Sequence, residues 1–522
     1  MQTTLSDRQI YYFRVICIAV LLAGAACYVV FTIHWQWMWD TQVMHYIVLL
    51  LNHGKVPYKD IYDINMPGAY LTERWAIGIF GGGDLGWRLY EFTLLGSMTG
   101  AMMVIAWPYD WLAGLFAGVL YSIQLGSMGP WQATERDEVM TVLIFIGYAF
   151  LMLAVRKNMP ALMLLFGLAM GLAILIKPTV VPFVLCLLLL LLPVLRRRSK
   201  SPTAYLLLAL AGLAIALGIL LDFLLPQHAF GSFFFILSKL VPYYSSLAHP
   251  TLLVLIRRSI PQAFRVYFPL ALLLAIAGRS RERRNAAEDA DWTLNWEIWV
   301  VRAGVLFGGI SYFIQRKGYD YHRTALVCFG LLWIGLEFTA AMNDRGWRRN
   351  VGVAGMAFGV LFMVPFNAWK VHGQHQVNAA VPVLEQDLVR LGGDKLQGRV
   401  QCLDLVGGCY SALYHLGLVQ STGFPGDLQF FGPDDGKVVP YYRKIFLDEI
   451  HQNPPIAILL SNEWYQESNY SFNKLNTWPE LRDYLNSAYR LQATEGPFIL
   501  YSAPMEYRIY VLKGSFADRP GL

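Results

Sequence analysis

The stretch from residue 39 to residue 70 combines charged and imidazole side chains with aromatic and aliphatic ones, directly after the first long apolar run of the chain. Ionisable side chains at a membrane are costly and mark functional sites by default. Asp40 follows Trp35, Trp37 and Trp39, whose indole rings favour the depth of the lipid headgroups. An aspartate held there could act as a general base on an acceptor hydroxyl. The alternative is a polar loop that only joins two helices. Other polar side chains of the stretch are His45, His53, Lys55, Lys59, Asp60 and Asp63.

A second set of charges forms the motif TERDEVM, residues 134–140. Its charged members are Glu135, Arg136, Asp137 and Glu138. Three carboxylates and a guanidinium beside a membrane are costly unless they form pairs or bind a ligand. Arg136 suits a phosphate because its planar guanidinium can donate two parallel hydrogen bonds, while an acidic neighbour could orient it or bind a hydroxyl or a metal. We therefore rank Arg136 and Asp137 above the two glutamates. The alternative is a solvated loop with local salt bridges.

Two further polar motifs interrupt apolar hairpins. Lys177 lies in ILIKPTVVP, where the following proline ends the helix and leaves the ammonium at its end. This lysine either extends to the surface or faces an anionic headgroup. The second motif is SYFIQRKGYDYHRT, residues 311–324, whose hydrogen-bond donors suit phosphate oxygens. The alternative is that this motif anchors lipid headgroups. Its polar members are Gln315, Arg316, Lys317, Asp320, His322 and Arg323.

The composition is that of a polytopic membrane protein. The chain has 522 residues, of which 56% are hydrophobic and 15% charged, and its mean hydropathy is +0.41. Apolar runs of about 20 residues, long enough to cross a bilayer, recur along it. The net charge of +6 is better explained by basic loops than by nucleic-acid binding. We expect eleven spans, near residues 13–33, 87–107, 111–126, 139–155, 159–176, 179–195, 203–225, 262–278, 297–314, 322–341 and 351–367.

Basic clusters predict the orientation of these spans. They precede the first span and follow the fourth, sixth, eighth and tenth, and comprise Arg8, Arg14, Arg156, Lys157, Arg196, Arg197, Arg198, Lys200, Arg279, Arg281, Arg283, Arg284, Arg345, Arg348 and Arg349. All lie on one side if the N-terminus is cytoplasmic, and an odd number of spans then exports the C-terminal part. The four polar motifs and a long loop at 226–261 fall on the outer face. The first apolar run is too long for a signal-peptide core, so we expect it to stay as a helix.

The remaining regions complete a two-part organisation. We expect a transmembrane module over residues 1–368, whose outer loop 34–86 holds interfacial helices. The run GAYLTERWAIGIFGG within that loop is short and amphipathic, and we interpret it as a helix in the outer interface rather than as a span.

Residues 369–522 have the composition of a soluble domain. Strands expected at 399–405, 456–460 and 498–501 alternate with helices near 381–391, 410–418 and 479–487, which predicts a small extracytoplasmic α/β domain. Cys402 and Cys409 could form a disulfide on an oxidising exterior. That bond requires a tight return of the chain, because the two residues are close in sequence.

Together the outer motifs offer one base and several cations, which we expect to converge on one chamber at the depth of a lipid phosphate. Such a chamber suits the transfer of a group from a lipid-linked phosphate. Positive charges held in place there would stabilise the phosphate leaving group while an acceptor hydroxyl attacks. The sequence contains no glycine-rich nucleotide loop and no HExxH motif.

These motifs resemble those of the bacterial GT-C class of integral-membrane glycosyltransferases, in the branch related to protein O-mannosyltransferases and the lipid A aminoarabinose transferase. The resemblance is carried by Asp40 after the first helix, by LLNHGKVPYKDIYDINMPGAYL, ERDE, LAILIKPT and QRKGYDYH, and covers the first ten spans better than the tail. It implies an inverting transfer of a hexose or pentose from a polyprenyl-phosphate donor. The acceptor would be a glycan, lipid or protein of the cell envelope, at the outer (periplasmic) face of the bacterial plasma membrane.

By the same resemblance, Asp40 corresponds to the catalytic aspartate of the first loop, and Arg136 and Asp137 correspond to the polar pair of the second. Many members carry a second acidic residue beside the first aspartate, whereas Thr41 stands here, so the use of a divalent metal stays open. The tail resembles variable outer domains, for which we infer no catalytic role. Contacts to the donor phosphate are expected from Lys177, Arg316, Lys317 and His322.

Two other classes of protein stay open. A transporter or flippase of a lipid-linked sugar would hold phosphate with the same cations, but transporters commonly show repeated halves and helices broken in mid-membrane, and we find no repeat. An envelope scaffold would depend on its exported domain and would tolerate changes at Asp40, Arg136 and Lys317 together.

Overall fold

A computed structural model describes residues 6–199, 201–247, 250–259, 262–285, 296–464, 470–500 and 503–518. The chain divides into two compact units, each built from three segments that are distant in sequence. The helical unit comprises Met1–Trp35, Gly83–Leu220 and Pro250–His375. The mixed unit comprises Gln36–Gly82, Leu221–His249 and Gln376–Leu522. Residues 36–82, which follow the first helix, therefore group with the C-terminal tail.

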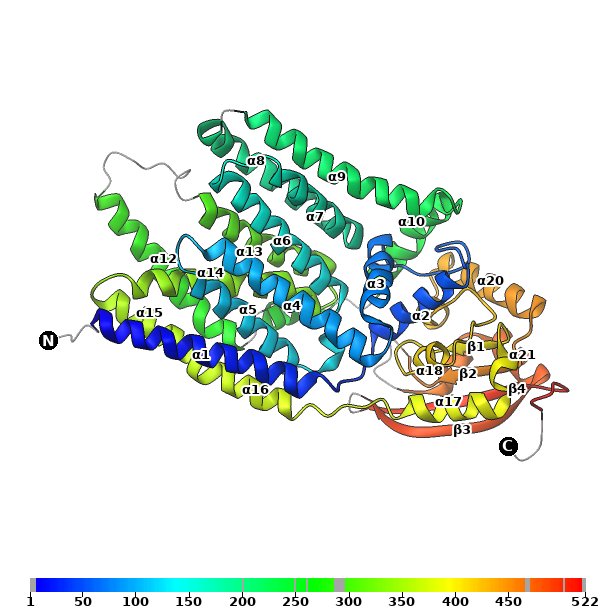
Figure 1. The fold of residues 1–522 in the computed structure, drawn as a ribbon. Helices are drawn as coiled ribbons and strands as arrows, with labels where there is room; N and C mark the ends of the chain where they lie inside the picture. Colours follow the sequence, from blue (N-terminus) through cyan, green and yellow to red (C-terminus); the bar gives the residue numbers. More distant parts are fainter. Residues whose placement is uncertain are drawn as a thin grey trace. The chain divides into compact units, whose positions relative to one another are not determined.

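The helical unit is a bundle of long apolar helices (Figure 1). In the described ranges, eight helical segments are long and apolar enough to cross a membrane, and three shorter apolar helices accompany them. All eleven predicted spans coincide with helices, which confirms the polytopic helical architecture. The helices are α1 (Asp7–Thr32), α4 (Asp84–Ala106), α5 (Trp111–Gly126), α6 (Arg136–Arg156), α7 (Leu162–Ile176), α8 (Val181–Arg198), α9 (Pro202–Leu224), α11 (Leu252–Ser259), α12 (Gln262–Asn285), α13 (Trp296–Gln315), α14 (Thr324–Met342), α15 (Trp347–Ala357) and α16 (Val364–His372), with the π-helical segment η5 (Phe358–Met363) between the last two.

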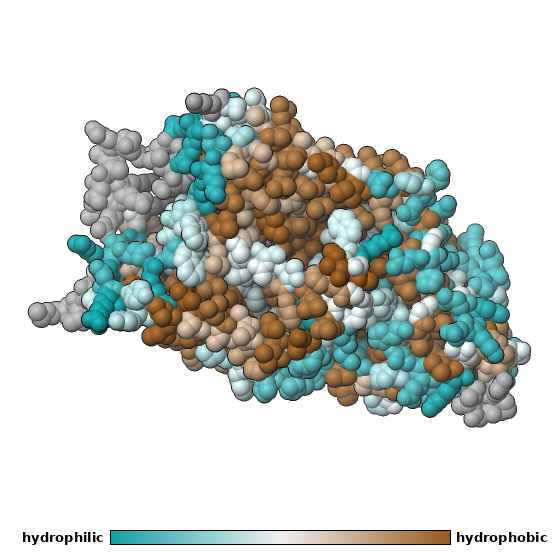
Figure 2. All heavy atoms as spheres, viewed as in Figure 1, coloured by the Kyte–Doolittle hydropathy of each residue, from teal (hydrophilic) through white to brown (hydrophobic). Residues whose placement is uncertain are grey.

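Apolar side chains cover the outside of this unit as well as its interior. Ile16 and Val30 of α1 are exposed, as are Leu207 and Leu217 of α9, and Figure 2 shows hydrophobic residues gathered over these helices. Contiguous exposed apolar surface is unfavourable in water and marks a surface that meets lipid or another apolar partner.

Of the basic clusters, Lys200 and the side chains at 279–284 lie outside the described residues.

Small residues let central helices approach closely. A Cβ atom at Gly114 of α5 would collide with the backbone of α4 at Met102, and one at Gly308 of α13 would collide with the backbone of α14 at Leu326. Close backbone approach through small residues is a main source of helix association in lipid. The ends of α13 and α14, which carry part of the polar motif at 311–324, are thereby held beside each other.

The mixed unit contains a four-stranded sheet of order β1-β2-β4-β3 (Figure 1). Its strands are β1 (Val400–Leu403), β2 (Ala457–Ser461), β3 (Tyr489–Leu500) and β4 (Ala503–Leu512). β1 and β2 are parallel, with Val400 opposite Ala457, and β4 is antiparallel to both β2 and β3. Every residue of β1 and β2 is buried, including the polar Gln401 and Ser461, so both faces of these strands are covered. The helices are α2 (Asp40–Asn52), α3 (Pro67–Phe80), α10 (Phe230–Ser246), α17 (Ala380–Leu391), α18 (Cys409–His415), α19 (Leu428–Phe431), α20 (Val438–Gln452) and α21 (Pro479–Ala488).

The small α/β domain predicted for the tail is confirmed in outline. Its first two strands and its three expected helices lie close to the predicted positions, and Cys402 and Cys409 form a disulfide. The strand expected at 498–501 is the end of the longer β3, and Tyr501 lies outside the described residues. β4 and α20 were not predicted. α20 carries Pro440 in its first turn, where a proline is tolerated because that N–H has no helical partner.

Residues 36–82 pack against elements of the tail. The Tyr46 hydroxyl accepts a hydrogen bond from the Gln420 backbone N–H (2.8 Å), and the Tyr62 N–H donates to the Gly423 carbonyl (2.7 Å). α3 has 14 residues, about 21 Å of helix, which is too short to cross a bilayer. Its helical conformation agrees with the sequence, and its location in the interface stays a prediction. The region 226–261, expected as a loop, instead contains α10 and α11.

Candidate functional site

Four polar side chains meet in the helical unit: Asp137, Lys177, Gln315 and His322, here called the Lys177 cluster. Lys177 Nζ donates to Asp137 Oδ2 at 2.6 Å and to Gln315 Oε1 at 2.8 Å. His322 Nε2 lies 3.9 Å from the same Asp137 oxygen. These residues come from three separate sequence motifs, and the structure brings them together.

Helix ends position the Lys177 cluster. Asp137 lies in the first turn of α6, where the helix dipole stabilises a carboxylate. Lys177 follows the last residue of α7 in an extended conformation, because the proline after it disfavours a helical residue there. Gln315 ends α13, and His322 lies in the 3-10 turn η4 (Tyr321–Arg323) that leads into α14. The cluster therefore joins the ends of four elements.

The Lys177 cluster is largely shielded from solvent. The side chains of Asp137 and His322 are 2% and 7% exposed, and that of Lys177 is 19% exposed. His322 Nδ1 is buried and makes no hydrogen bond to any described residue. A buried polar atom without a partner is costly, so an incoming ligand that supplied one would gain binding energy there.

Lys317 lies in the same polar motif. Its side chain is buried, and burial lowers the pKa of Lys317 to about 8. The residues on either side, Arg316 and Gly318, have φ of 51° and 72°. Burial makes the charged form of the Lys317 side chain less favourable, and a bound anion would stabilise that charged form. Lys317 therefore remains a candidate contact for phosphate.

The glutamates of TERDEVM serve the structure of the loop. Glu135 is the N-cap residue of α6 and is buried. Glu138 is fully buried, and its Oε2 accepts a hydrogen bond from the Thr134 N–H at 2.8 Å. Trp87 Nε1 of α4 donates to the Thr134 hydroxyl at 2.6 Å. Glu138 and Trp87 thus fix the turn that leads into Arg136 and Asp137.

Unusual backbone conformations flank the candidate residues. Trp39, Thr134 and Arg316 have φ of 59°, 59° and 51°. Positive φ is uncommon for residues other than glycine, and such strain gathers at functional sites. The residues that follow directly are Asp40, Glu135 and Lys317. The same conformation occurs at Asn158 and His228, outside the candidate motifs, so positive φ shapes the local turns and does not by itself mark a functional residue.

Asp40 belongs to the mixed unit, where it is half-buried and begins α2.

Later on α2, the buried His45 has its Nδ1 2.8 Å from Glu73 Oε1 of α3. The Trp37 ring stacks on the His45 imidazole, with centroids 4.7 Å apart, and Tyr414 of α18 contacts its edge. The His45–Glu73 pair was missed at the level of sequence, because only the packing of α3 on α2 brings the two residues together.

The other candidates of this stretch have local roles. Asp60 Oδ2 accepts from the Val56 N–H at 2.9 Å and closes a turn. His53 is exposed, with its Nδ1 2.9 Å from the Leu49 carbonyl of its own helix, and Lys59 is exposed. Asp63 accepts hydrogen bonds from the Tyr70 hydroxyl and the Asn65 amide, each at 2.7 Å. These contacts account for His53, Asp60 and Asp63 without a ligand.

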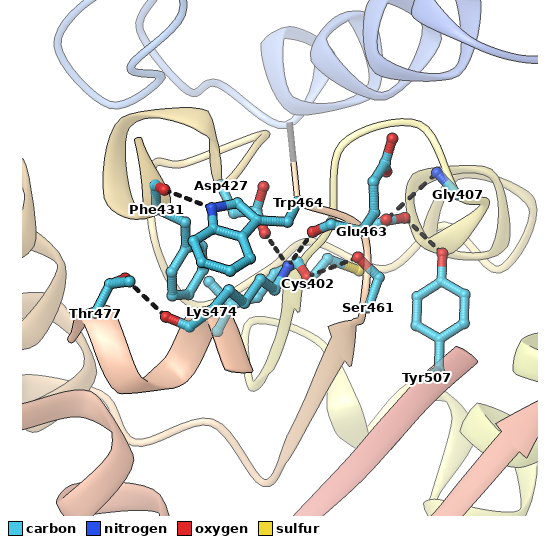
Figure 3. Close-up of polar contacts among 12 residues, drawn as sticks. Cys402, Gly407, Asp427, Phe431, Ser461, Glu463, Trp464, Lys474, Thr477 and Tyr507 are labelled. Atoms are coloured by element: carbon cyan, nitrogen blue, oxygen red, sulfur yellow. Dashed lines mark hydrogen bonds and ion pairs between the residues drawn. The ribbon is translucent and has the colours of Figure 1, made fainter. Parts of the chain in front are cut away.

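A second polar cluster lies at the carboxyl ends of β1 and β2 (Figure 3). Asp404 accepts from the Tyr507 hydroxyl at 2.6 Å and from three backbone N–H groups of the following turn. Lys474, fully buried, donates to Asp427 Oδ2 at 2.6 Å and to the Glu463 carbonyl at 2.7 Å. Burial, reinforced by the charge of Asp404, raises the pKa of Glu463 to about 8. Because these groups satisfy one another, we interpret this cluster as one that holds loops to the sheet.

The described residues contain no group of three or more histidine, cysteine or acidic side chains that could hold a metal ion. The Lys177 cluster supplies a single carboxylate, and the ammonium of Lys177 already neutralises it at 2.6 Å. A divalent cation at Asp137 would have to displace that ammonium. The Lys177 cluster therefore does not fit a metal site.

Comparison with known proteins finds one family model and several solved structures that are similar to this chain. Residues 67–221 match the sequence model of the family described as dolichyl-phosphate-mannose-protein mannosyltransferase. No curated protein matches the chain. Among solved structures, ArnT from Cupriavidus metallidurans bound to undecaprenyl phosphate has a TM-score of 0.51 at 12% identity, over 99% of this chain and all of that one (100%). The Archaeoglobus fulgidus oligosaccharyltransferase tethered to an acceptor peptide has a TM-score of 0.50 at 10% identity, over 86% of this chain and 69% of that one.

The protein has the fold of the GT-C glycosyltransferases, a polytopic helical module with a small C-terminal sheet domain, and the resemblance predicted from its sequence is confirmed. The family model covers α3 to α9 and therefore includes Asp137 and Lys177. At these identities the structural likeness shows the fold alone.

Proposed function

We propose that this protein transfers a sugar, with inversion, from a polyprenyl-phosphate donor to an acceptor hydroxyl of the cell envelope. The observation that carries the proposal is the Lys177 cluster, in which a shielded ammonium is held by Asp137 and Gln315 with the imidazole of His322 beside it. The family match over residues 67–221, which contains Lys177 and Asp137, supports the same reaction class.

In the proposed reaction the cations bind the donor phosphate. A phosphate oxygen would take the place of one of the two acceptors of Lys177 Nζ, while Asp137 keeps the ammonium oriented. Lys317, Arg316 and His322 would supply further donors. As the bond between the anomeric carbon and the phosphate oxygen breaks, negative charge grows on the leaving polyprenyl phosphate. Preorganised cations in a shielded site stabilise that charge more than water does.

Asp40 is the proposed general base. The acceptor oxygen attacks the anomeric carbon from the face opposite the phosphate, the new glycosidic bond forms, and the acceptor proton passes to the Asp40 carboxylate. The strained φ of 59° at Trp39 fixes the start of α2 and hence the position of Asp40. Further proposals are that the N-terminus is cytoplasmic and that the reaction occurs at the outer face of a bacterial plasma membrane.

The direct test uses the purified full chain in lipid, isotopically labelled polyprenyl-phosphate sugars and an envelope extract. We expect loss of the donor and a matching gain of mass on an acceptor glycan, lipid or protein. Asp40→Asn should reduce this turnover by about 10²- to 10⁴-fold while donor binding stays measurable.

A transporter of lipid-linked sugar gives a different result in the same assay. In sealed proteoliposomes, a transporter would move the donor between leaflets, and Asp40→Asn would do so at the rate of the parent. If neither protein transferred sugar in that experiment, the proposed transferase activity would be excluded. The variant Asp60→Asn serves as a matched control, because Asp60 lies in the same stretch but only closes a local turn.

A further inference from the structure

A cavity of about 750 Å³ lies in the helical unit where α1 begins, α14 ends and α15 begins. Its lining includes Arg14, Arg345, Arg349 and Asn343, together with the apolar Ile10 and the aromatic Tyr11. This α1/α15 pocket is separate in the chain from every motif assigned to the transfer reaction. Figure 2 shows hydrophilic residues gathered around the beginnings of α1 and α15.

The pocket carries a positive charge. Three guanidinium groups line it, and the one carboxylate in its lining, Asp7, is 92% exposed and lies 3.0 Å from Arg349. The neighbouring Asp344 is engaged by Arg348 at 2.8 Å. The buried Asp110 neutralises Arg14 at 2.5 Å, and the well-solvated Asp7 offsets only part of the charge of Arg349, so Arg345 supplies most of the positive charge that the pocket presents.

Hydrogen bonds to neighbouring residues hold two of the arginines in place. Arg14 donates to the buried Asp110 at 2.5 Å and to Asn343 Oδ1 at 2.9 Å. Arg349 Nε donates to the Asp344 carbonyl at 2.8 Å. Such contacts reduce the entropy that these side chains lose when an anion binds. Arg345 is exposed and free to turn towards a ligand at the rim.

The start of α15 adds a second feature that favours an anion. The helix has 11 residues, its N-cap residue is Gly346, and no side chain caps it. The first N–H groups of a helix have no intrahelical acceptor and carry a partial positive charge. Gly346 itself lines the pocket, between Arg345 and Arg349 in the chain. The uncapped N–H groups therefore lie beside the arginines.

Neighbouring side chains indicate that the pocket lies at headgroup depth. Tyr11 and Trp347 are exposed, at 63% and 44%, and exposed aromatic rings of this kind favour the interface between lipid and water. Further along α1, Ile16 and Leu22 are exposed apolar residues against which acyl chains could lie. A ligand with a phosphate head and apolar chains matches both parts of this surface.

We propose that the α1/α15 pocket binds the phosphate of an anionic glycerophospholipid headgroup, with the arginines as donors and the acyl chains along α1. The same donors would accept a free phosphate ester, so the test must separate the two sources. The site is independent of the transfer reaction.

The test measures lipid binding by native mass spectrometry on the full chain. Parent protein is titrated with phosphatidylglycerol and with phosphatidylcholine, and the double variant Arg345→Gln/Arg349→Gln is treated in the same way. The control Arg196→Gln/Arg197→Gln removes the same charge from the end of α8, outside the pocket. We expect the parent and the control to bind phosphatidylglycerol at least about tenfold more tightly than phosphatidylcholine, and the pocket variant to lose that preference.

Glycerol 3-phosphate, added as a competitor, identifies the source of the phosphate. Displacement of the lipid only at a large excess supports a lipid headgroup, whereas displacement at equal concentration indicates a soluble phosphate ester. If the double variant does not fold, Arg345→Gln alone replaces it, because that side chain is exposed. Equal preference for phosphatidylglycerol in the pocket variant and the control would overturn the proposal.

Discussion

Lys177 and Asp137 form an ion pair, with Nζ 2.6 Å from Oδ2, that joins the end of α7 to the start of α6. Asp137 is nearly inaccessible to solvent, so its charge depends on Lys177. The pair can serve the structure, the reaction or both. Variants that remove one partner or both distinguish these roles.

Lys177→Met should lower both stability and donor binding. Removing the ammonium leaves the Asp137 carboxylate buried without its cation, which typically costs about 3–5 kcal/mol. Asp137→Asn in the Lys177→Met background removes that carboxylate and should recover most of the lost stability. Donor binding should not recover, because the phosphate contact is still missing. Thermal unfolding and a donor-binding titration measure the two effects, and parent-like donor binding by the double variant would show that Lys177 does not contact phosphate.

Donor binding should weaken as the pH rises above about 8. The pKa of Lys317 is lowered to about 8 by burial, so its ammonium is increasingly lost above that pH and can no longer attract phosphate. Arginine keeps its charge throughout this range. Lys317→Arg should therefore retain donor affinity at pH 9, where the parent has lost it. Binding titrations from pH 6.5 to 9.5 test this, and a parent profile that stays flat across the range would contradict a phosphate contact by Lys317.

Asp40→Asn should reduce turnover without a matching loss of donor affinity. A general base typically contributes about 10²- to 10⁴-fold to the rate, and asparagine keeps the shape of the side chain but cannot accept the proton. Single-turnover measurements with saturating donor isolate this step. A loss that appeared only in the Michaelis constant for the donor would assign Asp40 to binding rather than to proton transfer.

Much of the architecture was predictable because each span is a simple pattern. Runs of about 20 apolar residues are long enough to cross a bilayer, and all eleven coincide with helices. β1 and β2 were found as short buried apolar runs. β4 was missed although Glu506 and Arg508 alternate with buried apolar residues in the period of a half-buried strand. α20 was missed because it begins near a proline.

The site was predictable in its parts but not in its pairings. Lys177 and Asp137 each stood out as charges in apolar surroundings, yet only the packing of α6 against α7 brings them within 2.6 Å. The same holds for His45 and Glu73, which lie on different helices. No periodicity in a sequence encodes which helix ends meet, because that depends on packing between distant segments.

The contribution of Glu463 to the stability of the folded chain should fall as the pH rises from about 5 to 8. The pKa of Glu463 is raised to about 8 in the folded chain, whereas an unfolded glutamate titrates near 4.3. Between these values the folded state binds more protons than the unfolded state, so the free energy of unfolding decreases as the pH rises. Glu463→Gln removes the titrating group and should flatten this part of the profile.

The control for that experiment is Glu480→Gln, because Glu480 is an exposed glutamate of α21. Thermal unfolding of the full chain is followed at several pH values for the parent and both variants. The control should keep the slope of the parent, because Glu480 is exposed on α21 and makes no contact with the cluster at the ends of β1 and β2 among the described residues. If Glu463→Gln kept that slope as well, the proton taken up on folding would belong to another group, and the cluster at the ends of β1 and β2 would not hold a protonated Glu463.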